Sequence, residues 1–399
     1  MSACATQSLN ESNKDPNRLT NEPIRRDNRL IILLWQLSGW PKLRYDADSV
    51  LGVLVELAAA RASLQERVSA LGLQDRSELA LDVFQSDALG TAMIEGEALP
   101  PESVRSSIAR GLHLDGARQA PSERHVEGLV EMLDDATRSH GEALTEERLF
   151  GWHAALFPSG YSHLHPITVG SWRKDPVSVQ SGGADSATIH FKAPGPARVP
   201  EEMAALLDWW NRAEIADGAL KAALAHLWFE TIHPFDDGNG RVGRALVDMA
   251  LAAGDASALR YYSVSAQIFE ERHDYYRQLE AAQRGDLDVT AWVEWFLGCI
   301  LRSVQAAGAR MQSAELRARL RARLSSQGLS PRQTKVLHTL IEHEPGGFEG
   351  GMTNAKYRSI TGASKATASR DLKDLVLRGL LSEGDSSGRS TRYYLSLEA

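Results

Sequence analysis

Residues 233–244 read HPFDDGNGRVGR and place one histidine, two aspartates, three glycines and two arginines in one short stretch. His233 is the only one of these side chains that changes charge near neutral pH, which makes it the candidate general base. Asp237 is a hard oxygen ligand of the kind that Mg²⁺ uses together with substrate phosphates. The combination of base, metal ligand and cations predicts a phosphoryl-type transfer site.

The glycines and arginines of this stretch could bind an anion. Gly238, Asn239 and Gly240 form a flexible loop directly before a helix, where backbone N–H groups and the helix dipole favour negative charge. Arg241 and Arg244 are three residues apart, so they lie on one side of that helix and can both bind phosphate oxygens. The alternative is a solvated helix–loop–helix turn in which the histidine only caps a helix.

The same stretch resembles the Fic family signature, H-x-F-x-[D/E]-G-N-G-R-x-x-R. The matching positions are His233, Phe235, Asp237, Gly238, Asn239, Gly240, Arg241 and Arg244. So many fixed positions in one block exclude the capping alternative. The resemblance implies that the protein transfers AMP from ATP to a Ser, Thr or Tyr hydroxyl of a protein, including its own chain.

The resemblance also implies a role for each residue. His233 would deprotonate the target hydroxyl, and Asp237 would hold Mg²⁺ across the α- and β-phosphates of ATP. Residues 238–240 would cradle these phosphates with help from Arg241, and Arg244 would bind the γ-phosphate. Relatives called Doc carry another signature and act as kinases, so the intact GNGRVGR favours AMP transfer. The loop itself would be held from inside by the Phe235 ring.

A hairpin is expected upstream of the signature. VSVQ and ATIHF predict two short strands on either side of SGGADS, within the Gly-, Pro- and Ser-rich residues 169–200. The hairpin resembles the family's flap, which binds a target segment by strand addition. The resemblance places Ile189 and His190 against nucleotide or target, and it places Tyr275 in the adenine pocket. The alternatives are a plain surface hairpin and core packing of Tyr275.

TAMIEG at residues 91–96 matches the family's inhibitory motif, [S/T]-x-x-x-E-[G/N]. Thr91 and Glu95 are four residues apart and therefore share one face of a helix. By resemblance, Glu95 pairs with Arg244, takes the place of the γ-phosphate and keeps the enzyme inactive. The alternative is a helix that simply ends at Gly96.

Apolar residues recur at helical spacing through most of the chain, so the fold class is mainly α, a helical Fic core with a β-hairpin flap. Residues 35–51 resemble the N-terminal domain of a bacterial Fic subgroup. The expected order is a disordered polar tail over 1–28, an N-terminal helical domain with the inhibitory helix over 29–123, the Fic catalytic domain over 124–314, a linker helix over 315–328 and a winged helix over 329–399.

The last segment predicts three short helices and a two-stranded ribbon, with a recognition helix that begins near Ser364. Ten Lys and Arg against eight Asp and Glu leave a charge of only +2 over residues 329–399. Basic side chains on the expected helix and wing are Lys365, Arg370, Lys373, Arg389 and Arg392. DNA is therefore a less favoured partner than the enzyme itself or a second copy in a homodimer.

The composition limits the class of protein. A net charge of −8 gives no overall electrostatic attraction to nucleic acid or an anionic membrane, and two cysteines exclude a disulfide framework or a cysteine zinc site. The longest aliphatic run, LIILLW at 30–35, is too short to cross a bilayer, so we expect a cytoplasmic protein. Two other functions stay open: removal of AMP from a modified protein by the same residues, and a DNA-binding regulator whose Fic core senses nucleotide.

Overall fold

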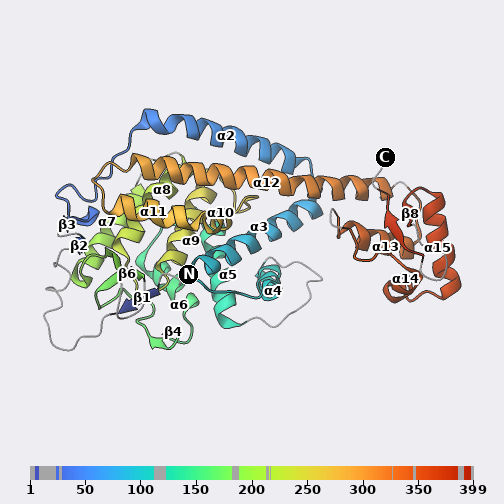
Figure 1. The fold of residues 1–399 in the computed structure, drawn as a ribbon, viewed down its shortest axis with the longest axis horizontal. Helices are drawn as coiled ribbons and strands as arrows, with labels where there is room; N and C mark the ends of the chain where they lie inside the picture. The colour runs from blue at the N-terminus through green and yellow to red at the C-terminus, as the bar shows by residue number, and fades with distance from the viewer. Residues whose placement is uncertain are drawn as a thin grey trace. The chain divides into compact units, whose positions relative to one another are not determined.

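The protein is described here from a computed structural model (Figure 1). The described residues are 5–8, 24–26, 29–111, 123–181, 188–212, 215, 217–325, 327–344, 347–384 and 391–396. The chain divides into two compact units, residues 1–64 with 80–307 and residues 65–79 with 308–399. Helices dominate both units, which confirms the predicted mainly α class. No helix in the described part of the chain is both long and apolar enough to cross a membrane.

Most of the helical segment before the signature belongs to the same unit as the signature, with residues 65–79 as the exception. After a short 3-10 helix η1 (Leu34–Gln36), the chain forms α2 (Ala47–Ser69), α3 (Leu73–Ile94) and α4 (Pro101–Gly111). The predicted inhibitory motif begins in the last turn of α3, which ends at Ile94, and it closes at Gly96, whose φ of 82° lies in the left-handed region. Residues 29–64 and 80–111 are therefore part of one core with the catalytic helices rather than a separate domain.

Two short strands lie within the predicted polar tail. Strand β1 (Ala5–Ser8) pairs antiparallel with β6 (Val177–Ser181), and β2 (Ile24–Arg26) pairs with β3 (Arg29–Ile31). The composition of residues 1–28 predicts disorder because it lacks apolar periodicity, but a strand that adds to an existing edge needs only its backbone hydrogen bonds. The other residues of this tail lie outside the described part of the chain.

Helices α8 (Gly218–Ile232) and α9 (Asn239–Gly254) form the centre of the first unit and pack on each other. Almost every residue of α8 is buried, as expected for a helix that is apolar on all sides. The surrounding helices are α5 (Arg124–Arg138), α6 (Glu146–Leu156), α7 (Val199–Arg212), α10 (Val264–Glu270), α11 (Arg272–Gln283) and α12 (Thr290–Ser325). Among them, α5 packs on α9, and α7 and α11 pack on α8.

The predicted flap is present as a hairpin. Strand β6 pairs antiparallel with β7 (Thr188–Lys192). The predicted tip SGGADS spans residues 181–186, and all of it except Ser181 lies outside the described part. Its base is fixed by a small cluster of Leu33, Trp35, Phe191 and Ala193, in which the Trp35 indole N–H donates to the Lys192 carbonyl at 2.8 Å. A second short hairpin, β4 (Tyr161–Ser162) with β5 (His165–Pro166), lies between α6 and the flap in the chain.

The second unit contains α13 (Pro331–Ile341), α14 (Asn354–Thr361), α15 (Lys365–Leu377) and the antiparallel strands β8 (Leu381–Glu383) and β9 (Tyr393–Leu395). This order agrees with the predicted three helices and ribbon, and Ser364 caps α15 by accepting the Thr367 N–H at 3.2 Å. The winged-helix assignment stays a prediction. Of its basic side chains, Lys365, Arg370, Lys373 and Arg392 are exposed, while Arg389 lies outside the described residues.

The predicted linker over 315–328 is not a separate helix. Helix α12 continues through this stretch to Ser325. Leu316, Leu320 and Leu324 recur every four residues and pack into the core of the second unit, so the apolar period that began before residue 315 is not interrupted.

Candidate active site

His233 ends helix α8 in a left-handed conformation, with φ 52° and ψ 61°. Its backbone N–H still donates to the Phe229 carbonyl at 2.8 Å, which closes the last turn of the helix. Because few non-glycine residues adopt this conformation, the chain leaves α8 at an angle set by this one residue. The His233 side chain is 10% exposed, so a small part of the ring remains open to a reactant.

A buried carboxylate lies behind the His233 ring. The Glu230 Oε2 atom is 3.6 Å from His233 Nδ1, one helical turn earlier on α8. Burial alone would raise the pKa of Glu230, but His233, His226 and Arg244 together hold that pKa below its usual value. An ionised carboxylate at Nδ1 favours a proton on that nitrogen, which leaves Nε2 to act as the base. The sequence analysis did not identify Glu230.

The signature loop is held in shape from inside. The Asn239 side chain accepts the Phe235 N–H and donates to the Phe235 carbonyl, both at 2.9 Å, and the Phe235 ring is fully buried. That ring stacks on His153 at 4.2 Å, which confirms its predicted position under the loop. His153 Nδ1 accepts the Gly170 N–H, and Nε2 contacts the Asp237 carbonyl at 3.1 Å. Burial lowers the pKa of His153 to about 4, so this histidine is a neutral structural link rather than a second base.

Glu95 occupies the start of helix α9. A Cβ atom at position 240 would overlap the Glu95 carboxylate, so that carboxylate lies directly on the backbone of Gly240. Arg244 donates to Glu95 Oε1 at 2.7 Å and to the Thr91 hydroxyl at 2.6 Å, and its side chain is 1% exposed. The predicted contact between Glu95 and Arg244 is therefore confirmed, and a negative group lies where a helix N-terminus binds anions.

Arg241 is paired in a similar way. Its guanidinium donates to Glu97 Oε2 at 3.2 Å and lies 3.9 Å from Asp237 Oδ1. Thus both signature arginines contact carboxylates that flank Gly96. The sequence analysis missed Glu97, although a second acid directly after the inhibitory glycine, in EGE, was an available signal.

Asp237 opens onto a cavity of about 1240 Å³ that is also lined by Glu95, Glu97 and Arg241. Its carboxylate accepts the Gly238 N–H at 2.6 Å and the Ser162 hydroxyl. Among the described residues, no three His, Cys, Asp or Glu side chains are grouped to hold a metal ion. A single carboxylate in a roomy cavity fits Mg²⁺ that takes its remaining ligands from water and substrate phosphates.

The flap strand β7 is tied to helix α11. His190 Nδ1 lies 3.2 Å from Glu280 Oε2, and the His190 carbonyl accepts from the Arg284 guanidinium at 2.6 Å. Ile189 lies in the same strand, and its side chain is outside the described part of the chain. The predicted contact of these two residues with nucleotide or target stays a prediction.

Tyr275 is not brought to the cavity. Its ring is 2% exposed, and its hydroxyl lies 2.9 Å from His226 Nε2 in the core between α8 and α11. Tyr275 packs here as paired aromatic residues on a helix often do, and its predicted adenine contact stays a prediction. The next residue, Tyr276, reaches the end of the inhibitory helix instead, where its hydroxyl donates to the Ile94 carbonyl at 3.3 Å.

Arg173 joins the flap to the end of α8. Its guanidinium is buried and donates to the carbonyls of His233 at 2.8 Å, Asp175 at 2.9 Å and Pro194 at 2.5 Å, with a longer bond to Ile232. Burial lowers the pKa of Arg173 to about 10, which still leaves it charged at neutral pH. The sequence analysis missed this residue because an arginine in a Gly- and Pro-rich loop has the pattern of an exposed one.

Taken together, the site is a base at the end of one helix and an anion site at the start of the next, which defines a phosphoryl-transfer type of centre. Residues 143–251 match the Fic/DOC family, and residues 33–114 match a domain of unknown function (DUF4172). Over residues 143–251, the chain is therefore similar to the Fic/DOC family.

Two relatives and one solved structure define the similarity further. A protein adenylyltransferase Fic from Nematostella vectensis is 26% identical over 53% of this chain and 46% of its own length. A probable protein adenylyltransferase from Aquifex aeolicus is 32% identical over 25% of this chain and 28% of its own length. The chain thus spans less than half of either relative. A crystal structure of a Fic family protein from Desulfovibrio desulfuricans G20 shares the fold, with a TM-score of 0.54, 21% identity and coverage of 89% of this chain and 98% of that one.

Proposed function

We propose that the protein transfers AMP from ATP to a hydroxyl group of a protein, and that Glu95 keeps this activity low. The observation that carries the proposal is the position of Glu95, on the backbone of Gly240 and bonded to Arg244 beside His233. The carboxylate is accepted there because the start of α9, together with Arg244, suits an anion. The cavity beside it has room for a polyphosphate, which we take to be the natural anion.

The reaction follows from the order of groups along the loop. His233 Nε2 takes the proton from the target hydroxyl, and that oxygen attacks the α-phosphate while the bond to pyrophosphate breaks. The backbone N–H groups at the start of α9, together with Arg241, hold the phosphate oxygens. When bound at Asp237, Mg²⁺ supplies positive charge that offsets the charge of the phosphates. The ion pair with Glu230 stabilises the protonated His233 that results.

Glu95 and a terminal phosphate compete for the same partners in this proposal. Both require Arg244 and the start of α9, and two negative groups cannot share one buried arginine without a large cost. ATP then binds in a pose that is unsuited to transfer until the end of α3 moves. Glu97 competes with phosphate for Arg241 in the same way. This competition is weaker, because the Glu97 side chain is about one-third exposed.

The position of an isotopic label tests the reaction class. Glu95→Gly protein is incubated with Mg²⁺ and ATP labelled at either the α- or the γ-phosphate, and label on protein is counted. The proposal predicts covalent label from the α-position only. Label from the γ-position would indicate a kinase, and label from neither would contradict AMP transfer. His233→Ala in the same background is the control: it should bind ATP by calorimetry and take up no label.

A further inference from the structure

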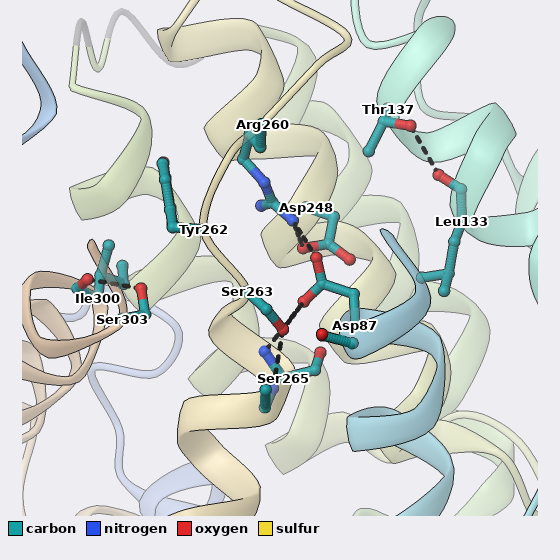
Figure 2. A network of polar contacts seen from close by, with 12 residues as sticks. Asp87, Leu133, Thr137, Asp248, Arg260, Tyr262, Ser263, Ser265, Ile300 and Ser303 are labelled. Carbon is teal, nitrogen blue, oxygen red and sulfur yellow. Dashed lines mark hydrogen bonds and ion pairs between the residues drawn. The ribbon is translucent and has the colours of Figure 1, made fainter. Parts of the chain in front are cut away.

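The inhibitory helix has a second polar contact with the core, one turn before Thr91. Asp87 lies on the same face of α3 as Thr91 and is 5% exposed. Its carboxylate accepts from Arg260 at 3.0 Å, from the Ser263 hydroxyl at 2.7 Å and from the Ser265 N–H at 3.2 Å (Figure 2). None of these partners belongs to α3, so Asp87 attaches that helix to the segment between α9 and α10.

Arg260 extends this contact to the catalytic helix α9. The same Arg260 nitrogen that donates to Asp87 donates to Asp248 Oδ1 at 2.5 Å (Figure 2). Asp248 lies one turn after Arg244 on α9, just as Asp87 lies one turn before Thr91 on α3. Helices α3 and α9 are therefore joined at two adjacent turns, once by Arg244 with Thr91 and once through Arg260.

Close backbone packing makes the position of α3 sensitive to this contact. A Cβ atom at Gly90 would lie 2.7 Å from the Ala266 backbone nitrogen and 2.8 Å from the Ser265 carbonyl carbon. Helix α3 thus rests directly on the start of α10, where the neighbour is backbone that cannot rotate away. A small shift at Asp87 must then be transmitted along the helix to Thr91 and Glu95.

We propose that Asp87, Arg260 and Asp248 form a docking network that positions the end of α3, and through it Glu95, against Arg244. The inference rests on the proposed function, because it assumes that Glu95 restrains AMP transfer. All three are positioning residues that act through Glu95. Loss of the network should free the end of α3 and raise transfer while the catalytic groups stay in place.

The charges of the network indicate which variant to use. Two buried carboxylates face one guanidinium, and burial raises the pKa of Asp87 despite Arg260. Asp87→Ala removes the attachment of α3 and leaves Arg260 and Asp248 as a balanced pair, so no buried charge is left alone. Alanine also favours helix more than aspartate does, so a looser α3 in this variant cannot result from a weaker helix propensity.

Asp82→Ala is the matched control. Asp82 is on the same helix and forms an exposed ion pair with Arg105 at 2.6 Å. Both variants, the wild type and Glu95→Gly are compared by amide hydrogen exchange over residues 87–95 and by the rate of AMP transfer. Asp87→Ala is expected to raise the exchange rate of residues 87–95 and the rate of AMP transfer by about tenfold each. This is the factor that one hydrogen bond to a charged group typically contributes. Asp82→Ala should match the wild type, and Asp87→Ala should add nothing in a Glu95→Gly background.

The exchange and transfer readouts separate the two proposals. If Glu95→Gly raises transfer and Asp87→Ala does not, the docking network is overturned and the proposed function stands. If Glu95→Gly leaves transfer unchanged, the inhibitory role of Glu95 fails, and the network is still judged by exchange. Faster exchange confined to residues 87–95 supports it. Unchanged exchange, or exchange that rises equally in α8 and α9, means general destabilisation and overturns it.

Discussion

At the scale of single residues, His233 and Glu230 are the pair most directly concerned with chemistry. The two side chains are one turn apart on α8, and both are largely buried. In the proposed reaction, His233 takes a proton and becomes positive in a place from which water is mostly excluded. The carboxylate 3.6 Å away then stabilises that charge more than it would in solvent.

Glu230→Gln should therefore slow AMP transfer by at least about tenfold, because losing about 1.4 kcal/mol of stabilisation of the protonated base corresponds to that factor. The substitution is measured in a Glu95→Gly background, where transfer is expected to be fast, and ATP affinity should be unchanged. Glu127→Gln, which removes a carboxylate from an exposed pair with Arg110, is the control. Equal rates of AMP transfer in the two variants would show that Glu230 only packs in the core and does not assist His233.

Much of the site could be predicted from sequence, and the reason is local spacing. Residues 233–244 are one continuous segment, so residue types alone indicated base, metal ligand and anion site. The pairing of Glu95 with Arg244 could be predicted only from the family resemblance, because the two are far apart in the chain. Arg173 carried no pattern of its own, since the carbonyl groups that it binds belong to any residue. For Glu97 the only signal was its place in EGE, and its contact with Arg241 is fixed by packing.

At the scale of elements, the flap depends on one buried arginine. The Arg173 guanidinium binds carbonyls on both sides of the hairpin and at the end of α8, where the helix dipole favours a cation. The strands could be predicted from their alternation and the turn residues between them. Their attachment to His233 could not be predicted from the sequence, because it is made through backbone carbonyl acceptors.

Arg173→Met should lower the free energy of unfolding by about 2–4 kcal/mol, since it leaves several buried carbonyls without a donor. Hydrogen exchange should rise in β6 and β7 more than in α8. The control is Arg277→Met, which removes an exposed guanidinium paired with the exposed Asp274. The free energy of unfolding of the control should fall by less than about 1 kcal/mol. Similar losses in urea denaturation for the two variants would contradict the role of Arg173.

At the scale of the whole molecule, the main departure from expectation is that the inhibitory segment belongs to the catalytic core. Periodicity predicted the helices of residues 47–111 but not their packing partners, and α3 is held by Asp87 and Arg260 within the first unit. Such a contact buries charge, which ordinarily costs stability unless every charge is paired. The network with Asp248 therefore links folding to protonation.

Burial, together with the charge of Asp87, raises the pKa of Asp248 to about 7 although Arg260 and Arg244 oppose the shift. A carboxyl whose folded pKa is raised stabilises the fold at low pH, and this contribution is lost as pH rises through about 7. The wild type should thus lose on the order of 2 kcal/mol of unfolding free energy between about pH 5 and pH 7 relative to Asp248→Asn. Asp208→Asn, in an exposed pair with Arg212, should follow the wild type. Parallel pH profiles for the wild type and Asp248→Asn would contradict this assignment.

The central claim is that the protein is a transferase restrained by its own helix α3. Intact-protein mass spectrometry tests this claim most directly. Wild type, Glu95→Gly and Glu95→Gly with His233→Ala are each incubated with ATP and Mg²⁺, and bound AMP is followed over time. The account predicts AMP addition in Glu95→Gly at least about tenfold faster than in the wild type, because a charged hydrogen bond no longer holds Arg244. It predicts none in the double variant. Equal rates in the wild type and Glu95→Gly, or addition without His233, would contradict it.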